Sequence, residues 1–231
     1  MIKICGLSTP ATLDAALAAG ADMVGFVRFP LSPRHLDLDL GRDLARRAEG
    51  RAERVLLLVD PDDRELDDAV AALRPDLIQL HGQEAPERVA AIRTRAGLPV
   101  MKAVGIADPA DIARLELYAG AADRLMVDAK PTPGARLPGG NGVSFDWSLL
   151  AGLDRARHLM LSGGLDPDNV ARAIAASGVR AVDVSSGVEK RPGVKDPDKI
   201  TAFVAAARAA FAAAGAAPAA EAAAAAGRSV A

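Results

Sequence analysis

The sequence predicts a protein of the α/β class: a single (β/α)8 barrel with eight parallel strands and an outer layer of helices. Apolar runs of strand length alternate with amphipathic runs of helix length, and the pair occurs eight times. The length of 231 residues suits a minimal barrel of this kind. No Gly-x-Gly-x-x-Gly motif follows the first apolar run, so a barrel is favoured over a doubly wound dinucleotide-binding sheet.

The apolar runs place each strand of this TIM barrel. We expect strands at Ile2–Cys5, Met23–Phe26, Val55–Val59, Leu77–Leu80, Val100–Val104, Leu125–Asp128, His158–Leu161 and Ala181–Ser185. Seven helical segments are expected between them. Several helices should begin at a capping residue followed by proline, whose missing N–H costs nothing in a first helical turn. These pairs are Thr9-Pro10, Asp60-Pro61, Asp108-Pro109, Asp166-Pro167 and Asp196-Pro197.

Two segments are expected to lie outside the regular pattern. Lys130–Ser144 is rich in Gly and Pro and should form a loop. We expect residues 1–207 to form the catalytic barrel domain, and residues 208–231 to be the end of the last helix and an Ala-rich, disordered tail. Arg208, Pro218 and Glu221 interrupt the tail, so it does not predict a transmembrane helix.

The composition of the chain limits the kinds of partner and metal that we expect it to bind. The 28 basic and 30 acidic side chains give a formal charge of −2, which indicates neither a nucleic-acid nor a membrane surface. The one cysteine cannot form an internal disulfide and the N-terminus lacks a secretory pattern, so a cytoplasmic protein is expected. The three histidines, His35, His81 and His158, are not paired at ligand spacing, and we expect no metal.

Polar residues at the carboxyl ends of barrel strands are the candidates for catalysis. In the first strand, alternation turns Lys3 and Cys5 inward, with Cys5 at the mouth. A lone cysteine is often only a small buried hydrophobe. At this position, however, the Lys3 ammonium could stabilise a thiolate and make Cys5 a base.

Three further inward residues lie on other strands. Asp128 ends the sixth strand; it could cap a turn, but no helix follows it directly, so a proton donor is the sharper interpretation. His81 follows the fourth strand and is as easily a structural hydrogen-bonding group as a substrate contact. Asp183, in the eighth strand, needs polar partners, and a sugar hydroxyl could be one.

Two glycine-bearing turns follow the seventh and eighth strands, which is the usual phosphate position in barrels. Each glycine-bearing segment alone is more readily explained as a structural turn, but the two together favour a phosphate site. The candidate residues are Gly163, Gly164, Ser185, Ser186 and Gly187. Arg34, just beyond the second strand, could bind a substrate carboxylate with two hydrogen bonds, although surface arginines are usually solvated.

In this order, the motifs resemble those of the phosphoribosylanthranilate isomerase family, the barrel enzymes of the tryptophan pathway. The resemblance runs from about Ile2 to Phe203 and leaves the C-terminal tail outside it. The motifs are Lys3-Ile4-Cys5-Gly6, Ser32-Pro33-Arg34, Gln79-Leu80-His81-Gly82, Phe145-Asp146-Trp147, Leu161-Ser162-Gly163-Gly164-Leu165 and Asp183-Val184-Ser185-Ser186-Gly187-Val188-Glu189.

The resemblance implies the activity and the roles of these residues. It implies an Amadori rearrangement of N-(5-phosphoribosyl)anthranilate without a cofactor, with Cys5 as general base and Asp128 as general acid. Arg34 matches the contact for the anthranilate carboxylate, His81 and Asp183 match substrate contacts, and the two glycine turns match the phosphate site. The implied partner is a small phosphoribosyl substrate, bound by a monomer or a homodimer.

Some features depart from the family pattern or leave alternatives. Asn141 stands where threonine is expected and Arg28 where an aromatic residue is expected. A related histidine-pathway aldose–ketose isomerase would use two carboxylates, which Cys5 argues against. A ribulose-phosphate epimerase would need metal ligands, and a barrel that only binds a phosphorylated metabolite would not need Cys5.

Overall fold

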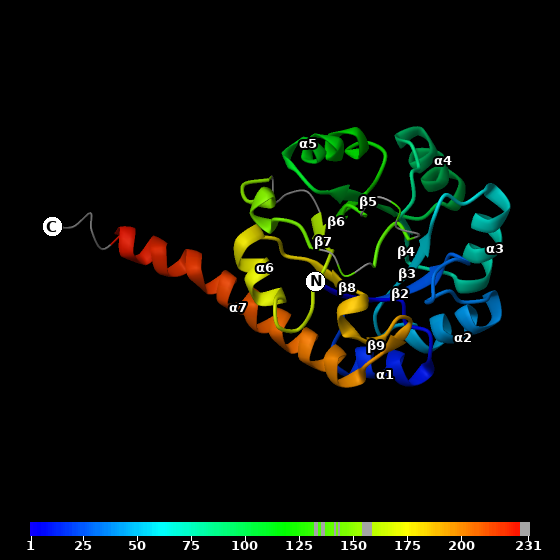
Figure 1. Cartoon of the computed structure of the whole chain (residues 1–231), viewed down its shortest axis with the longest axis horizontal. Coiled ribbons are helices and arrows are strands. Elements are labelled where there is room, and N and C mark those ends of the chain that lie inside the picture. The colour runs from blue at the N-terminus through cyan, green and yellow to red at the C-terminus, as the bar shows by residue number, and fades with distance from the viewer. Residues whose placement is uncertain (132–133, 135–136, 141, 143, 154–158, 227–231) are drawn as a thin grey trace.

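The computed structural model describes residues 1–231 except 132–133, 135–136, 141, 143, 154–158 and 227–231, and only the backbone of residues 216–226. A ring of strands lies at the centre, with helices around it (Figure 1). In the described part of the chain, eight parallel strands close into a barrel in the order β1-β2-β3-β4-β5-β6-β7-β8. The predicted fold class is therefore confirmed.

All eight barrel strands lie where the apolar runs predict them, with small differences at their ends. Their bounds are β1 Ile2–Cys5, β2 Met23–Arg28, β3 Glu53–Leu58, β4 Leu77–Leu80, β5 Val100–Ile106, β6 Arg124–Ala129, β7 Leu159–Leu161 and β8 Val182–Val184. The expected first residue of the seventh strand, His158, lies outside the described residues. The ring closes where β8 pairs with β1, which sets Lys3 opposite Asp183.

Helical segments occupy the connections between the strands. The α-helices are α1 Pro10–Ala18, α2 Leu38–Ala48, α3 Asp63–Leu73, α4 Pro86–Ala96, α5 Pro109–Ile112, α6 Val170–Ser177 and α7 Pro197–Ala226. Short 3-10 segments are η1 Ala113–Tyr118, η2 Trp147–Leu150 and η3 Ser186–Val188. Among the described residues between β6 and β7, only η2 is helical.

Two predicted helix starts are wrong, and the turns that precede these helices give the reason. Asp60 adopts a left-handed conformation with φ 46° and accepts a hydrogen bond from the Gln83 N–H, so α3 begins later, capped by Asp62. Asp166 likewise closes a turn by accepting a hydrogen bond from the N–H of Asn169. Helix α6 therefore begins only after Asn169. Capping side chains are also the residues that close turns, so the Asp-Pro signal is ambiguous.

Alternation along each strand separates an outer core from the apolar side chains inside the barrel. The outward side chains pack against the helices in the larger core, which includes Ile2, Ile4 and Val182. The inward side chains near the amino ends of the strands form an apolar layer that fills the barrel. This layer consists of Met23, Val55, Leu77, Met101, Ala103, Met126, Met160 and Ala181. The polar inward residues therefore lie toward the carboxyl ends, where the site is expected.

A short antiparallel ribbon follows β8 and was not predicted. It consists of β9 Glu189–Arg191 and β10 Val194–Lys195, joined through Gly193 at φ +80°. A Cβ atom at Gly193 would lie 2.5 Å from the carbonyl oxygen of Pro33, so glycine is needed here for both conformation and space. The ribbon therefore packs directly on the loop that carries Arg34.

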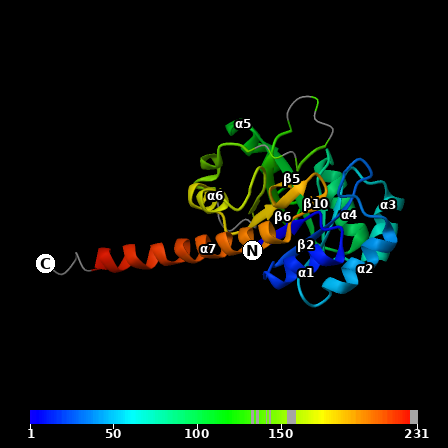
Figure 2. The ribbon, with the colours of Figure 1, turned by 60° about the horizontal axis from the view of Figure 1, so that its bottom comes forward.

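The last helix belongs to the barrel at its start and leaves it further on. Ile200, Phe203, Val204 and Ala207 are buried, and α7 packs against α1 and α6. Beyond them the helix continues to Ala226 and projects away from the barrel (Figures 1 and 2). The domain boundary at residue 207 stays a prediction. No helix in the described part of the chain is long and apolar enough to cross a membrane.

Candidate functional site

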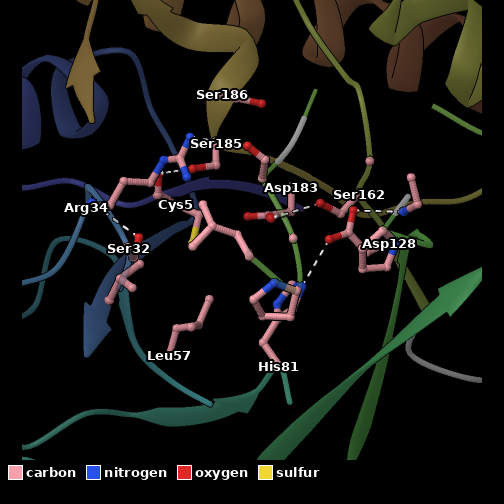
Figure 3. A pocket seen from close by; sticks show the side chains of 18 of the residues that line it. Cys5, Ser32, Arg34, Leu57, His81, Asp128, Ser162, Asp183, Ser185 and Ser186 are labelled. Carbon is pink, nitrogen blue, oxygen red and sulfur yellow. Dashed lines mark hydrogen bonds and ion pairs between the residues drawn. The ribbon is translucent and has the colours of Figure 1, made fainter. Parts of the chain in front are cut away.

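A pocket of about 800 Å³ opens at the carboxyl ends of the barrel strands. It collects nearly all of the side chains that the sequence singles out. These are Cys5, Arg34, His81, Asp128, Gly163, Gly164, Asp183, Ser185 and Ser186. Figure 3 shows them converging from different strands and loops. Around the ring, β1 with Cys5 and β6 with Asp128 are separated by β8 and β7, so the thiol and the carboxyl group approach the pocket from different sides.

Cys5 is the last residue of β1 and is 4% exposed. Burial raises the pKa of its thiol; the positive charge of Lys3 lowers the pKa, and the negative charge of Asp183 raises it. Lys3 thus acts in the expected direction, but its Nζ is engaged with Asp183 Oδ1 at 2.8 Å. The net result is a pKa above the ordinary value, so the thiol keeps its proton at neutral pH.

Asp128 belongs to a chain of three polar side chains. Its Oδ1 accepts from the Ala129 N–H at 2.9 Å, and its Oδ2 lies 3.0 Å from Nε2 of His81. On the other side of the imidazole ring, His81 Nδ1 lies 3.0 Å from Nε2 of Gln79. His81 therefore has a proton-exchange partner at one nitrogen and an orienting partner at the other.

Sequence reasoning did not assign Gln79 to the site. Gln79 nevertheless lies on the same inward face as His81, two residues further along the chain. Its side chain is fully buried, and Gln79 is one of the residues that line the pocket. Its amide Nε2 is the group that contacts His81. Period-two alternation counted back from His81 is the signal that points to Gln79.

Asp183 lies on β8 at the floor of the pocket. Its Oδ1 accepts from Lys3, and its Oδ2 accepts from the Ser162 hydroxyl at 3.2 Å. The protein thus supplies the partners that a buried carboxylate requires. Asp183 still lines the pocket, and so does Ser162, which sequence reasoning did not single out.

The two glycine turns after β7 and β8 lie side by side at one wall. Gly163 and Gly164 both have positive φ, +90° and +65°, and a Cβ at Gly163 would lie 2.5 Å from the Ala129 nitrogen. Gly187 does not line the pocket; a Cβ there would overlap the carbonyl oxygen of Leu165 in the neighbouring turn. Gly187 therefore lets the two turns pack together, and the backbone of these turns faces the pocket.

Arg34 reaches the pocket but is not a free guanidinium. Its Nε and Nη2 donate to the two carboxylate oxygens of Glu189, at 2.7 and 2.9 Å, and Nη2 also lies 3.4 Å from the Gly140 carbonyl oxygen. These contacts use Nε and Nη2, so the end of the guanidinium that carries Nη1 is the part available to a ligand. The side chain is 6% exposed.

Of the two departures from the expected pattern, only Arg28 belongs to the described residues. Arg28 donates through Nη1 to the carbonyl oxygen of Leu36 at 2.7 Å and does not line the pocket. Asn141 lies outside the described residues. In the part of the chain that the structure describes, no three His, Cys, Asp or Glu side chains gather closely enough to hold a metal ion.

Fold and site together define a (β/α)8-barrel protein whose thiol and carboxyl groups line one pocket beside two glycine turns. A family model described as N-(5′-phosphoribosyl)anthranilate (PRA) isomerase matches residues 2–206. The enzyme of that name from Azorhizobium caulinodans is 63% identical over 209 residues, covering 90% of this chain and 92% of its own. This chain therefore belongs to the N-(5′-phosphoribosyl)anthranilate isomerase family.

Solved structures agree with this assignment. The crystal structure of phosphoribosyl anthranilate isomerase from Thermotoga maritima has a TM-score of 0.80 at 35% identity, over 90% of this chain and 98% of that chain. A phosphoribosyl anthranilate isomerase crystallised with reduced 1-(o-carboxyphenylamino)-1-deoxyribulose 5-phosphate has a TM-score of 0.78 at 34% identity, with the same coverage. The likeness covers the barrel and its pocket.

Proposed function

We propose that this chain catalyses the Amadori rearrangement of N-(5-phosphoribosyl)anthranilate to 1-(2-carboxyphenylamino)-1-deoxyribulose 5-phosphate in tryptophan biosynthesis. The observation that carries the proposal is one pocket lined by both Cys5 and Asp128, at the ends of β1 and β6. An isomerisation by internal proton transfer needs an acid and a base and no hydride carrier. The names of the related enzymes support the same reaction.

The pocket offers a place for each part of this substrate. The backbone of the turns with Gly163, Gly164 and Ser186 suits the phosphate, because glycine lets N–H groups approach an anion closely. Arg34 suits the carboxylate of the anthranilate ring. The ribose then lies between Cys5 and Asp128, where Asp183 can accept a hydrogen bond from a sugar hydroxyl.

In the first step, protonated Asp128 donates its proton to the furanose ring oxygen. The bond between C1′ and the ring oxygen breaks, and the lone pair of the anthranilate nitrogen forms the C=N bond of a Schiff base. Asp128 is left as a carboxylate. His81 Nε2, 3.0 Å from Asp128 Oδ2, is placed to exchange the proton that resets it.

In the second step, Cys5 first loses its thiol proton to solvent, and the thiolate then removes the proton from C2′. The electron pair of that C–H bond forms the C1′=C2′ bond, and the former C=N pair returns to nitrogen, which gives an enolamine. The enolamine takes up a proton at C1′ and the C2′ hydroxyl loses one, so the ketone product has the same atoms as the substrate. Burial of Cys5 keeps competing water away from the reacting carbon.

The assay uses phosphoribosylanthranilate made in situ from anthranilate and ribose 5-phosphate, and follows the loss of its fluorescence. We expect Cys5→Ala and Asp128→Asn each to lower kcat by at least about 100-fold, because each removes one proton transfer. KM should stay within about threefold, since little contact area is lost. Unchanged turnover in either variant would contradict the mechanism, provided that thermal unfolding shows the variant to be folded.

Two further properties complete the proposal. The aldose substrate of the related histidine-pathway isomerase, assayed in parallel, should not be turned over. The Thermotoga maritima enzyme is dimeric; for this chain a monomer or a homodimer is expected, and sedimentation analysis distinguishes them. We place the reaction in the cytoplasm, where a single reduced cysteine is the ordinary state.

A further inference from the structure

A buried cluster of three charges lies behind the carboxylate end of the pocket. Glu189 is the first residue of β9. Both of its carboxylate oxygens accept hydrogen bonds from the Arg34 guanidinium, so the ion pair is bidentate. Lys195, the last residue of β10, donates to Glu189 Oε1 at 2.7 Å. The side chains of Glu189 and Lys195 are 4% and 0% exposed. The ribbon β9–β10 therefore brings a carboxylate and an ammonium group behind the guanidinium.

The three charges of this cluster do not cancel. Arg34 and Lys195 carry one positive charge each and Glu189 carries one negative charge, so the cluster has a net charge of +1. Burial disfavours the charge of Glu189, but the hydrogen bonds from Arg34 and the charge of Lys195 lower its pKa, so it is ionised at neutral pH. A buried net charge is costly unless an opposite charge reaches it. One ligand carboxylate would satisfy the cluster.

Hydrogen bonds fix the direction in which Arg34 can bind. Glu189 occupies the Nε edge of the guanidinium, and its Oε2 also accepts from the Gly193 N–H at 3.2 Å. Because the guanidinium is planar and rigid, anchoring this edge sets the orientation of the whole group in a side chain that lines the pocket. A long arginine side chain without this anchor would lose rotamer freedom each time it bound a ligand.

Lys195 also reaches the phosphate end of the pocket. It donates to the carbonyl oxygen of Ser185 at 2.9 Å and to its hydroxyl at 3.1 Å. Ser185 in turn donates to the Cys5 carbonyl oxygen at 3.2 Å. The same ammonium group thus contacts both the partner of Arg34 and the turn that follows β8.

We propose that Glu189 and Lys195 are positioning residues that determine specificity: they orient Arg34 and give its site the charge to accept one substrate carboxylate. This inference rests on the proposed function, because it concerns the same substrate. Neither residue touches the reacting carbon atoms in this scheme. Their removal should therefore impair recognition of the carboxylate and leave the proton transfers intact.

The experiment compares two substrates that differ only in the carboxylate. One is phosphoribosylanthranilate, and the other is the phosphoribosylamine formed in situ from aniline and ribose 5-phosphate, with its ketose product followed by chromatography. For Glu189→Ala and Lys195→Met we expect KM for the first substrate to rise at least tenfold and kcat to change less than about threefold. For the aniline substrate, kcat/KM of Glu189→Ala should stay within about threefold of the wild-type value. Lys195 also contacts Ser185, so Lys195→Met is judged by the ratio of the two KM values.

Two controls separate positioning from a general structural role. Lys190→Ala and Arg191→Ala remove exposed cations from the same ribbon and should leave both substrates unaffected. In an Arg34→Ala background, Glu189→Ala should have no further effect on KM, because the group it orients is already gone. Glu189→Gln keeps the shape of the side chain and serves as a second variant if the alanine variant does not fold.

The pH dependence offers an independent readout. Burial lowers the pKa of Lys195 to about 8, against the opposing charge of Glu189. Arg34 and Cys5 are the other titratable or charged groups that act on it. Above that pH the cluster loses its net positive charge, so the ratio of KM for the anthranilate substrate to KM for the aniline substrate should rise in the wild type and stay flat in Lys195→Met. Taking a ratio cancels titrations that affect both substrates.

The outcomes distinguish this inference from the proposed function. If the wild-type protein does not turn over phosphoribosylanthranilate, the proposed function fails. If the wild type is active but Glu189→Ala and Glu189→Gln lower kcat/KM equally for both substrates, the inference is overturned and the proposed function stands. The same holds if these variants change kcat/KM for neither substrate. An additive effect of Glu189→Ala in the Arg34→Ala background overturns it as well.

Discussion

Cys5 and Asp128 differ in their surroundings more than in their position. The thiol is buried between Lys3 and Asp183, whose opposite charges shift its pKa in opposite directions, so burial decides the result and raises it. The carboxyl group of Asp128 instead accepts from a backbone N–H and faces a histidine ring. The two groups therefore differ: the thiol must lose its proton before it can act as a base, whereas the carboxyl group has His81 as a hydrogen-bonding partner.

The raised pKa of Cys5 predicts how the free protein responds to pH. The thiolate appears only as the pH rises above the ordinary thiol value of about 8.5, so alkylation by iodoacetamide should be slow at pH 7 and accelerate through a higher midpoint. The measurement is simple because Cys5 is the one cysteine of the chain. kcat/KM, which reports the free enzyme, should rise over the same range, which lies above the pKa of about 8 at which Lys195 loses its proton. A midpoint near or below pH 7 would show that Lys3 outweighs burial.

At the scale of elements, the turn after β7 places a glycine of left-handed conformation in the wall of the pocket. Gly164 has φ +65° and lines the pocket. Gly97 has φ +62° at the end of α4, where an added Cβ atom would meet no other atom within 4 Å. Leucine at either position should cost about 1–2 kcal/mol of stability, because a left-handed conformation is strained for residues with a Cβ. The two positions are therefore matched in conformation and differ in location.

We expect Gly164→Leu to raise KM at least about tenfold with kcat less affected, because a side chain there blocks the close approach of a phosphate. Gly97→Leu should leave both constants near their wild-type values while lowering Tm by a similar amount. Steady-state kinetics and thermal unfolding of the pair provide the measurement. An unchanged KM in a folded Gly164→Leu protein would mean that the turn is structural only.

At the scale of the whole molecule, the end of α7 is separable from the barrel. Among the described side chains of this helix the last buried one is Ala207, and Arg208 still contacts Asp22 and the carbonyl oxygen of Gly20 at the amino end of β2. We expect a chain ending at Gly215 to keep its activity and its Tm within about 2 °C, because the removed residues follow the packed part of the helix.

Phe203→Ala is the matched change inside the packed part of the same helix. Its side chain is fully buried, and its removal should cost about 3–5 kcal/mol through lost burial and a residual cavity. Denaturant unfolding compares the two proteins. A large loss of stability in the shortened chain would show that residues 216–231 contribute to the fold.

Local patterns in the chain were enough to predict the barrel and most of the residues that line the pocket. Alternation with period two is local, so it assigned Lys3, Cys5 and Asp183 to the inside without any knowledge of their partners. The position of a residue at the carboxyl end of a strand then placed it at the mouth. The helix starts were less secure, because the Asp-Pro pairs at Asp60 and Asp166 close turns instead of beginning helices.

Only the tertiary structure decided which charged and polar groups meet. Arg34 and Glu189 are 155 residues apart, and Lys3 and Asp183 are 180 apart, so no periodicity within one strand predicts either pair. The ribbon that carries Glu189 and Lys195 is too short for a clear apolar pattern. These contacts exist because the closed ring brings β8 and its following segment beside β1 and the loop after β2, which is a property of the whole barrel.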